Sequence, residues 1–215
     1  MKLPVPWRAG RLQPPYKLIS VLLQYPDAAL AAAQEELHTA VTALPRGAAT
    51  TSLEQFWRYW EHTSPLAREQ RYVETFDLQK RTSLYLTFYL YGETRKRGIA
   101  LLRLKRMYAA AGLPLEAKEL PDYLPAMLEF AALAPAGYGQ IVLEEFRSGL
   151  ELLRLSLQEQ KSPYRFLIDA TCAGLRPLTP LDLERIRTLA VEGPPQEQVG
   201  LEPFAPPEVM PGVVR

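Results

Sequence analysis

Apolar residues recur at three- and four-residue intervals along most of the chain, and strand-like alternation is almost absent. This spacing places the apolar side chains along one face of a helix. Proline or glycine interrupts the pattern repeatedly, and each interruption marks the expected end of a helix. The expected helices cover about residues 16–25, 27–44, 52–63, 65–91, 93–111, 123–134, 138–158, 163–173 and 180–191.

Several expected helices carry recognisable start signals. Ser64, Ser162 and Thr179 each precede a proline, which is the usual order of an N-cap residue and the first helical residue. Thr51 and Glu54 have the spacing of a capping box. Between Pro65 and Gly92 no helix breaker occurs, so the pattern predicts a single helix of roughly seven turns there.

These elements predict an all-α fold, a single globular bundle of about eight or nine unequal helices spanning residues 16–191. No repeat of solenoid length is visible. Residues 1–15 are expected to be a flexible segment that is neither a secretory signal nor a membrane anchor. Residues 192–215 are rich in proline, and are either disordered or an extended strap held by apolar side chains such as Phe204.

Composition and charge narrow the classes of function. The 215 residues include 25 Lys+Arg and 24 Asp+Glu, so bulk charge gives no reason to expect nucleic acid binding or stable membrane insertion. One cysteine and two histidines leave few ligands for a zinc site, and we predict no metal. No common catalytic motif is present, so we predict no catalytic residues and favour a binding protein over an enzyme.

The segment 72–98 combines aromatic and charged residues in a regular pattern. Tyr85 and Tyr89 are four residues apart, as are Asp77 and Arg81, so a helix would place a salt-bridged row beside an aromatic stripe. One interpretation is a core helix whose tyrosine hydroxyls reach its rim. The other is the wall of a groove that receives a partner peptide.

The next segment is strongly basic. Residues 93–106 carry six positive charges and one negative charge, and three cations stand at the start of a helix, where the helix dipole disfavours them. This pattern is typical either of a solvated face or of a second surface for an acidic partner or an anionic cofactor. The residues of this second basic surface are Arg95, Lys96, Arg97 and Arg103.

Four stretches, residues 72–77, 80–89, 92–98 and 120–130, carry a resemblance to a known family. They read YVETFD, KRTSLYLTFY, GETRKRG and LPDYLPAMLEF. This pattern closely resembles the NarJ-type nitrate reductase assembly chaperones, also called nitrate reductase delta subunits, which belong to the redox-enzyme maturation chaperones. The resemblance covers about residues 16–175.

The resemblance implies an all-helical, cytoplasmic chaperone that is not an enzyme. Such proteins bind the N-terminal segment of the catalytic alpha subunit of respiratory nitrate reductase, which is typically basic and amphipathic. They keep that subunit competent for insertion of its molybdenum bis-molybdopterin guanine dinucleotide cofactor (bis-MGD) before it docks at the membrane. The chaperone itself is expected to bind no permanent cofactor and to be a monomer or a weak dimer.

The resemblance also implies a contact site. In related chaperones an acidic loop at the position of Asp122 contributes to leader binding, and here Tyr123 stands where the wider family has histidine. Asp122 lies between two prolines, so a stiff turn is expected to present its carboxylate, or to use it as the N-cap of the next helix. The full set of expected peptide-binding residues is Asp77, Arg81, Tyr85, Phe88, Tyr89, Asp122, Tyr123 and Glu129.

Two other classes of function stay open. A helical peptide-binding adaptor for another redox-enzyme precursor would use the same aromatic groove, and only the identity of the client separates the two hypotheses. A carboxylate-dependent enzyme would need a pair of carboxylates within reach of each other in a pocket.

Overall fold

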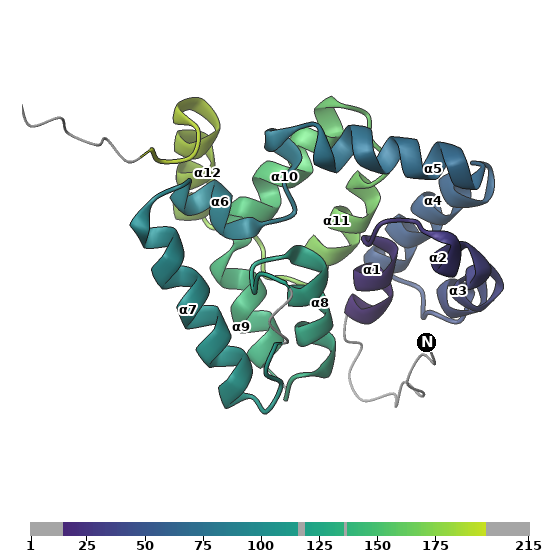
Figure 1. Ribbon diagram of the computed structural model, residues 1–215, viewed down its shortest axis with the longest axis horizontal. Coiled ribbons are helices and arrows are strands. Elements are labelled where there is room, and N and C mark those ends of the chain that lie inside the picture. The colour runs from purple at the N-terminus through teal and green to yellow at the C-terminus, as the bar shows by residue number, and fades with distance from the viewer. Residues whose placement is uncertain (1–14, 116–118, 136, 197–215) are drawn as a thin grey trace, which may run out of the picture.

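The computed structural model describes residues 15–115, 119–135 and 137–196, and these residues form an all-α fold, as the pattern predicts. Twelve α-helices are present in the described part, more than the eight or nine expected (Figure 1). They are α1 Tyr16–Leu22, α2 Ala28–Ala32, α3 Gln34–Thr42, α4 Ala48–Glu61, α5 Pro65–Tyr72, α6 Leu86–Tyr91, α7 Arg95–Ala110, α8 Leu124–Leu133, α9 Tyr138–Glu145, α10 Arg147–Glu159, α11 Arg165–Cys172 and α12 Pro180–Glu192.

The helices pack in two groups that meet near the middle of the molecule. Figure 1 shows α2 to α5 on one side and α6, α7, α9 and α12 on the other. Helix α1 packs on α8, α4 packs on α11, and α10 contacts α6, α11 and α12. A set of aromatic rings fills the core on the α4 side, where Tyr164 contacts the rings of Phe56, Tyr72 and Phe76. Burial of these large side chains is a principal stabilising contribution.

The predicted long helix 65–91 is wrong, because the chain is interrupted between α5 and α6. A π-helix, Val73–Asp77, and a 3-10 helix, Lys80–Thr82, follow α5. The Thr82 hydroxyl donates a hydrogen bond to the Thr75 carbonyl oxygen, and the Ser83 hydroxyl accepts one from the Tyr85 amide at 3.2 Å. Hydroxyl side chains that bond the nearby backbone compete with helical hydrogen bonds. The break also removes the expected i,i+4 geometry of Asp77 and Arg81.

Two other predicted helices are divided. The pattern over 27–44 forms α2 and α3, and that over 138–158 forms α9 and α10. In each case a single residue, Ala33 or Phe146, leaves helical geometry between the two helices. The apolar spacing continues across both residues, so the pattern alone does not predict these breaks.

The start signals are partly confirmed. Ser64 and Thr179 are N-caps as predicted, the latter with a capping box to Asp182. The start expected at Ser162 is wrong, because α11 begins only at Arg165. The capping box expected at Thr51 is also wrong, because α4 already begins at Ala48.

The expectations for the two chain ends concern residues that lie largely outside the described part, which begins at Pro15 and ends at Gln196. Within the proline-rich segment, the first residues after α12 lie against the turn between α6 and α7. A Cβ atom at Gly92 would overlap the carbonyl oxygen of Pro195, and Gly92 has a φ of +55°, which favours glycine. In the described part of the chain, no helix combines the length and the apolar character needed to cross a membrane.

Helices α8 and α9 approach each other so closely that a glycine is required at their contact. A Cβ atom built on Gly139 would overlap the Cα atom of Ala131 and lie 2.7 Å from its Cβ atom. Both residues belong to helices, so neither can move aside without shifting a backbone. By contrast, Gly98 on α7 has no atom within 4 Å of its Cβ position.

We therefore expect Gly139→Ala to lower the free energy of unfolding by about 1–3 kcal/mol, the usual cost of overpacking. The matched control is Gly98→Ala, which is also helical and should raise that free energy by up to about 1 kcal/mol because alanine favours helix. Urea unfolding followed by circular dichroism measures both changes. Equal effects of the two substitutions would contradict a close contact between α8 and α9 at Gly139.

Candidate functional site

An isolated backbone bridge joins two segments that carry most of the expected site. Tyr85 and Tyr123 pair in antiparallel fashion. The Leu86 amide donates to the Asp122 carbonyl at 3.0 Å, and the Leu124 amide donates to the Leu84 carbonyl at 2.8 Å. The start of α6 is thereby fixed beside the start of α8.

The side chain of Asp122 is buried beneath this bridge rather than presented at the surface. It is 0% exposed, and its Oδ2 atom accepts hydrogen bonds from the Thr87 hydroxyl and, at 3.3 Å, the Thr87 amide. Arg97 of α7 places Nη2 3.7 Å from the same oxygen and donates from Nε to the Thr87 hydroxyl at 3.1 Å. The carboxylate therefore holds α6, α7 and the loop before α8 together.

Both structural expectations for Asp122 are consequently wrong. The carboxylate does not face solvent, because Thr87 and Arg97 enclose it. It is not an N-cap, because the N-cap position of α8 is Tyr123 and makes no side-chain capping bond. A direct contact with a client peptide would first require this buried network to open.

Beside the bridge, four tyrosines form a continuous row that we call the aromatic row: Tyr25, Tyr72, Tyr123 and Tyr85. The rings of Tyr25 and Tyr72 are 5.5 Å apart, and those of Tyr123 and Tyr85 are 5.4 Å apart. The hydroxyls of Tyr72 and Tyr123 lie 3.5 Å from each other and join the two pairs. Tyr25 is 44% exposed and Tyr85 and Tyr123 are half-buried, whereas Tyr72 is buried behind them.

Carboxylates flank the aromatic row. The Tyr85 hydroxyl donates to Glu119 at 3.2 Å, and the Tyr25 hydroxyl donates to Glu69 at 3.3 Å. Burial, followed by the nearby charge of Glu119, raises the pKa of Tyr85 to about 12. Burial also raises the pKa of Tyr123, and the nearby charges of Glu119 and Asp77 add smaller contributions in the same direction. The tyrosines are therefore neutral near pH 7, and the charge along the row is negative.

The structure brings together some of the expected peptide-binding residues and separates others. Tyr85 and Tyr123 are ring neighbours, and Asp77 is close enough to Tyr123 to affect its pKa. Tyr89 instead points inward, where its hydroxyl donates to the carbonyl oxygens of Arg81 and Ser83 at 3.0 and 2.9 Å. It is 5% exposed, so the expected surface stripe of Tyr85 and Tyr89 is wrong.

The remaining expected residues lie at other contacts. Arg81 is exposed and lies 4.0 Å from Glu159, not in a pair with Asp77. Glu129 forms an ion pair with Lys17 of α1, and Phe88 is half-buried one turn into α6. Their role in peptide binding stays a prediction.

Sequence reasoning missed Tyr25, Tyr72, Glu69 and Glu119. Tyr25 and Glu69 belong to segments outside the family motifs, and only the fold brings them to the site. Tyr72 begins one of those motifs, but its spacing predicts no role for it. The available signal was the excess of tyrosine over phenylalanine, 11 against 7, because tyrosine suits half-buried surfaces.

Two cations of the second basic surface already have partners within the fold, which the sequence does not indicate. Arg95, Lys96 and Arg97 begin α7, as expected, but Arg97 is committed to Asp122 and Thr87. Arg103 forms an ion pair with Glu145 of α9 at 3.0 Å. Only two residues of α7 are buried, Leu104 and Tyr108, so few fully buried side chains attach this helix to the rest of the fold.

Comparison with known proteins agrees with the resemblance in the sequence. The profile of the family described as nitrate reductase delta subunit matches residues 25–168. The chain is 38% identical over 161 residues to the protein assigned as nitrate reductase molybdenum cofactor assembly chaperone NarJ in Bacillus subtilis (strain 168), across 74% of this chain and 87% of that protein. Its identity to the NarJ chaperone of Escherichia coli (strain K12) is 39%, across 71% of this chain and 65% of that protein, slightly less than two thirds of its length.

A solved structure has the same fold. The crystal structure of a candidate redox enzyme maturation protein from Archaeoglobus fulgidus superposes with a TM-score of 0.56 at 20% identity, covering 76% of this chain and 93% of that one. At this identity the likeness shows the fold alone. The relatives are assembly chaperones by name and not catalysts, in keeping with the prediction that the chain is not an enzyme. On the family profile and these identities, the chain belongs to the nitrate reductase delta subunit family.

Proposed function

We propose that this chain is an assembly chaperone that binds the N-terminal segment of the catalytic alpha subunit of respiratory nitrate reductase. It keeps that subunit competent for insertion of its molybdenum bis-MGD cofactor before the enzyme docks at the membrane. The chaperone acts in the cytoplasm, binds no permanent cofactor and is a monomer or a weak dimer. Family membership supports the chaperone role, and the aromatic row is the observation that supports the mode of binding.

The aromatic row has the properties that a basic amphipathic segment requires. Tyrosine rings bury apolar side chains and keep a polar edge toward water, and they lose little conformational entropy on binding. Glu69 and Glu119 are already bonded to the outer tyrosines, so acidic acceptors stand at both ends of the row. Apolar anchors would provide most of the affinity, while the carboxylates would favour a basic partner and set its register.

The backbone bridge explains how the row keeps its shape. Tyr123 and Tyr85 are held by main-chain hydrogen bonds, and Tyr72 donates its hydroxyl to the Leu23 carbonyl at 3.2 Å. A preorganised surface loses less entropy when it binds a flexible segment. The ordering cost would therefore fall mainly on the client, and the chaperone would change little.

Tyr85→Ala is expected to weaken binding of a synthetic peptide that copies the N-terminal segment of the alpha subunit by more than about 1 kcal/mol, the usual hot-spot threshold. The reason is the loss of one ring and its hydroxyl from the Glu119 end of the row. Isothermal titration calorimetry measures the effect, and wild-type binding should show a negative heat-capacity change because apolar surface is buried.

Tyr138→Ala is the control for the loss of a tyrosine ring outside the row, since Tyr138 is 44% exposed and lies after the far end of α8 from Tyr123. It should bind the peptide as wild type does. Wild-type affinity in folded Tyr85→Ala would refute the aromatic row as the binding surface. Equal affinity for an unrelated redox-enzyme leader would instead favour the adaptor hypothesis.

Asp122→Asn is expected to affect stability, and Asp77→Asn is expected to affect peptide binding. Asp122→Asn should lower the free energy of unfolding by about 1–3 kcal/mol, because it weakens a buried charged hydrogen-bond network. Asp77→Asn should leave that free energy within about 0.5 kcal/mol, because Asp77 is exposed, but should weaken peptide binding, most clearly at low salt.

Chemical unfolding and calorimetry at two salt concentrations measure these effects. An unaltered stability of Asp122→Asn would contradict the structural role of that carboxylate. Unaltered, salt-independent peptide binding by Asp77→Asn would remove Asp77 from the site.

A further inference from the structure

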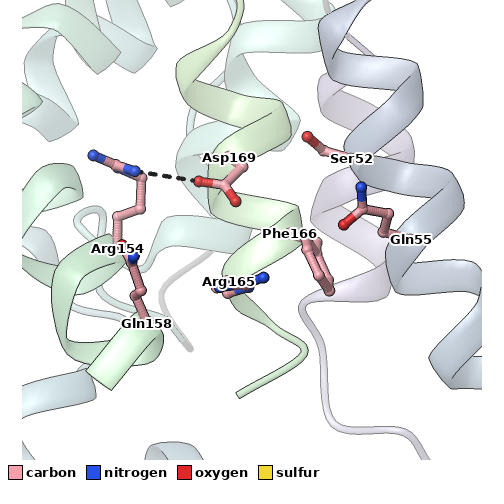
Figure 2. Close-up of a pocket in the computed structure, with 7 residues that line it drawn as sticks. All are labelled: Ser52, Gln55, Arg154, Gln158, Arg165, Phe166 and Asp169. Carbon is pink, nitrogen blue, oxygen red and sulfur yellow. Dashed lines mark ion pairs between the residues drawn. The ribbon is translucent and has the colours of Figure 1, made fainter. Parts of the chain in front are cut away.

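A pocket lies between α4, α10 and α11, and no residue of the aromatic row lines it. It has a volume of about 280 Å³. Its polar lining comes from three helices: Ser52 and Gln55 of α4, Arg154 and Gln158 of α10, and Arg165 and Asp169 of α11. Figure 2 shows the α4 side chains facing those of α11 across this space, with Arg154 and Gln158 on the opposite side of α11.

Most of the charge around this pocket is already neutralised. Arg147 and Glu151 form an ion pair at 2.8 Å, Glu151 accepts from Arg154 Nε at 2.6 Å, and Arg154 Nη1 lies 3.5 Å from Asp169. These two arginines and two acids sum to zero charge. They also fix Arg154 in place, since its guanidinium is held from two directions.

Arg165 is the uncompensated cation of the pocket. Its Cζ atom lies 4.5 Å from the ring centroid of Phe166, and within the described part of the chain it takes part in no ion pair. A guanidinium that stacks on an aromatic ring keeps its edge donors free, and stacking restricts the side chain. The pocket therefore offers one fixed cation with unused N–H groups.

The other lining groups can complete a donor set. The amides of Gln55 and Gln158 and the hydroxyl of Ser52 can each donate a hydrogen bond, and none of them is bonded to another atom among the residues that the structure describes. A phosphate group has several strong acceptor oxygens and pairs with guanidinium in a charge-assisted manner. The volume, at the low end for small-molecule pockets, suits a phosphate with at most a small substituent.

We propose that this pocket binds one phosphate group, as inorganic phosphate or as the end of a small phosphate monoester, with Arg165 as its principal cation. Asp169 does not oppose this, because its charge is matched by Arg154. The site is independent of the proposed peptide binding, so either can fail without the other.

The test is a titration of the full chain with sodium phosphate at constant ionic strength, balanced with sodium chloride and followed by ¹⁵N nuclear magnetic resonance. Saturable shifts are expected in the side-chain amides of Gln55 and Gln158 and in Nε of Arg165. Arg165→Gln should raise the apparent dissociation constant at least about fivefold, because it removes a charge-assisted hydrogen bond. Arg187→Gln, at an exposed arginine of α12, is the matched control and should bind as wild type does.

A parallel titration with ribose 5-phosphate distinguishes the two sources of the phosphate group. Tighter binding than phosphate assigns the site to a monoester, and weaker binding assigns it to the free ion. Shifts that do not saturate, or that cluster at the basic start of α7 instead, would overturn the proposal. Equal phosphate affinities of Arg165→Gln and the wild type would overturn it as well. If that variant does not fold, the residues that shift in the wild-type protein still test the proposal.

Discussion

The arrangement of α6, α7 and the loop before α8, on which the aromatic row depends, is fixed by one buried carboxylate, that of Asp122. The Asp122 carboxylate accepts hydrogen bonds from the hydroxyl and amide of Thr87 and forms an ion pair with Arg97. Its backbone carbonyl accepts a hydrogen bond from the Leu86 amide. A buried carboxylate without partners would be too costly to keep, so these contacts tie three segments into one arrangement. Because α7 buries only two residues, it relies on this junction more than a well-packed helix would.

The same junction connects stability to recognition. The bridge that covers Asp122 also places Tyr85 against Tyr123, and through Tyr123 it aligns Tyr72 and Tyr25. In the proposed mode of binding, Asp122 would therefore influence the client without touching it. Its carboxylate positions the rings, and in the proposed mode of binding Glu69, Asp77 and Glu119 would supply the negative charge for a basic segment. The proposal thus assigns most of the affinity to the rings and the selectivity for a basic partner to the acids.

The helical class could be predicted from the sequence because 3.6-residue periodicity is local, and the caps at Ser64 and Thr179 could be predicted for the same reason. The prediction failed between residues 73 and 85, where the hydroxyls of Thr82 and Ser83 and a bridge to Tyr123 outweigh helix propensity. Tyr85 and Tyr123 are identified through the family motifs. Contacts between distant segments determine the burial of Asp122 and Tyr89 and the packing of Tyr25 against Tyr72. The spacing of residues along the chain does not encode such contacts.

The central claim is that a basic client segment lies along the aromatic row with its cations beside the flanking acids. A double-mutant cycle tests it most directly, pairing Asp77→Asn in the chaperone with replacement of each basic residue of the peptide by glutamine in turn. The account predicts a coupling energy above about 0.5 kcal/mol for at least one pair, the range found for residues in contact. Additive effects for every pair, with wild-type peptide binding intact, would contradict it.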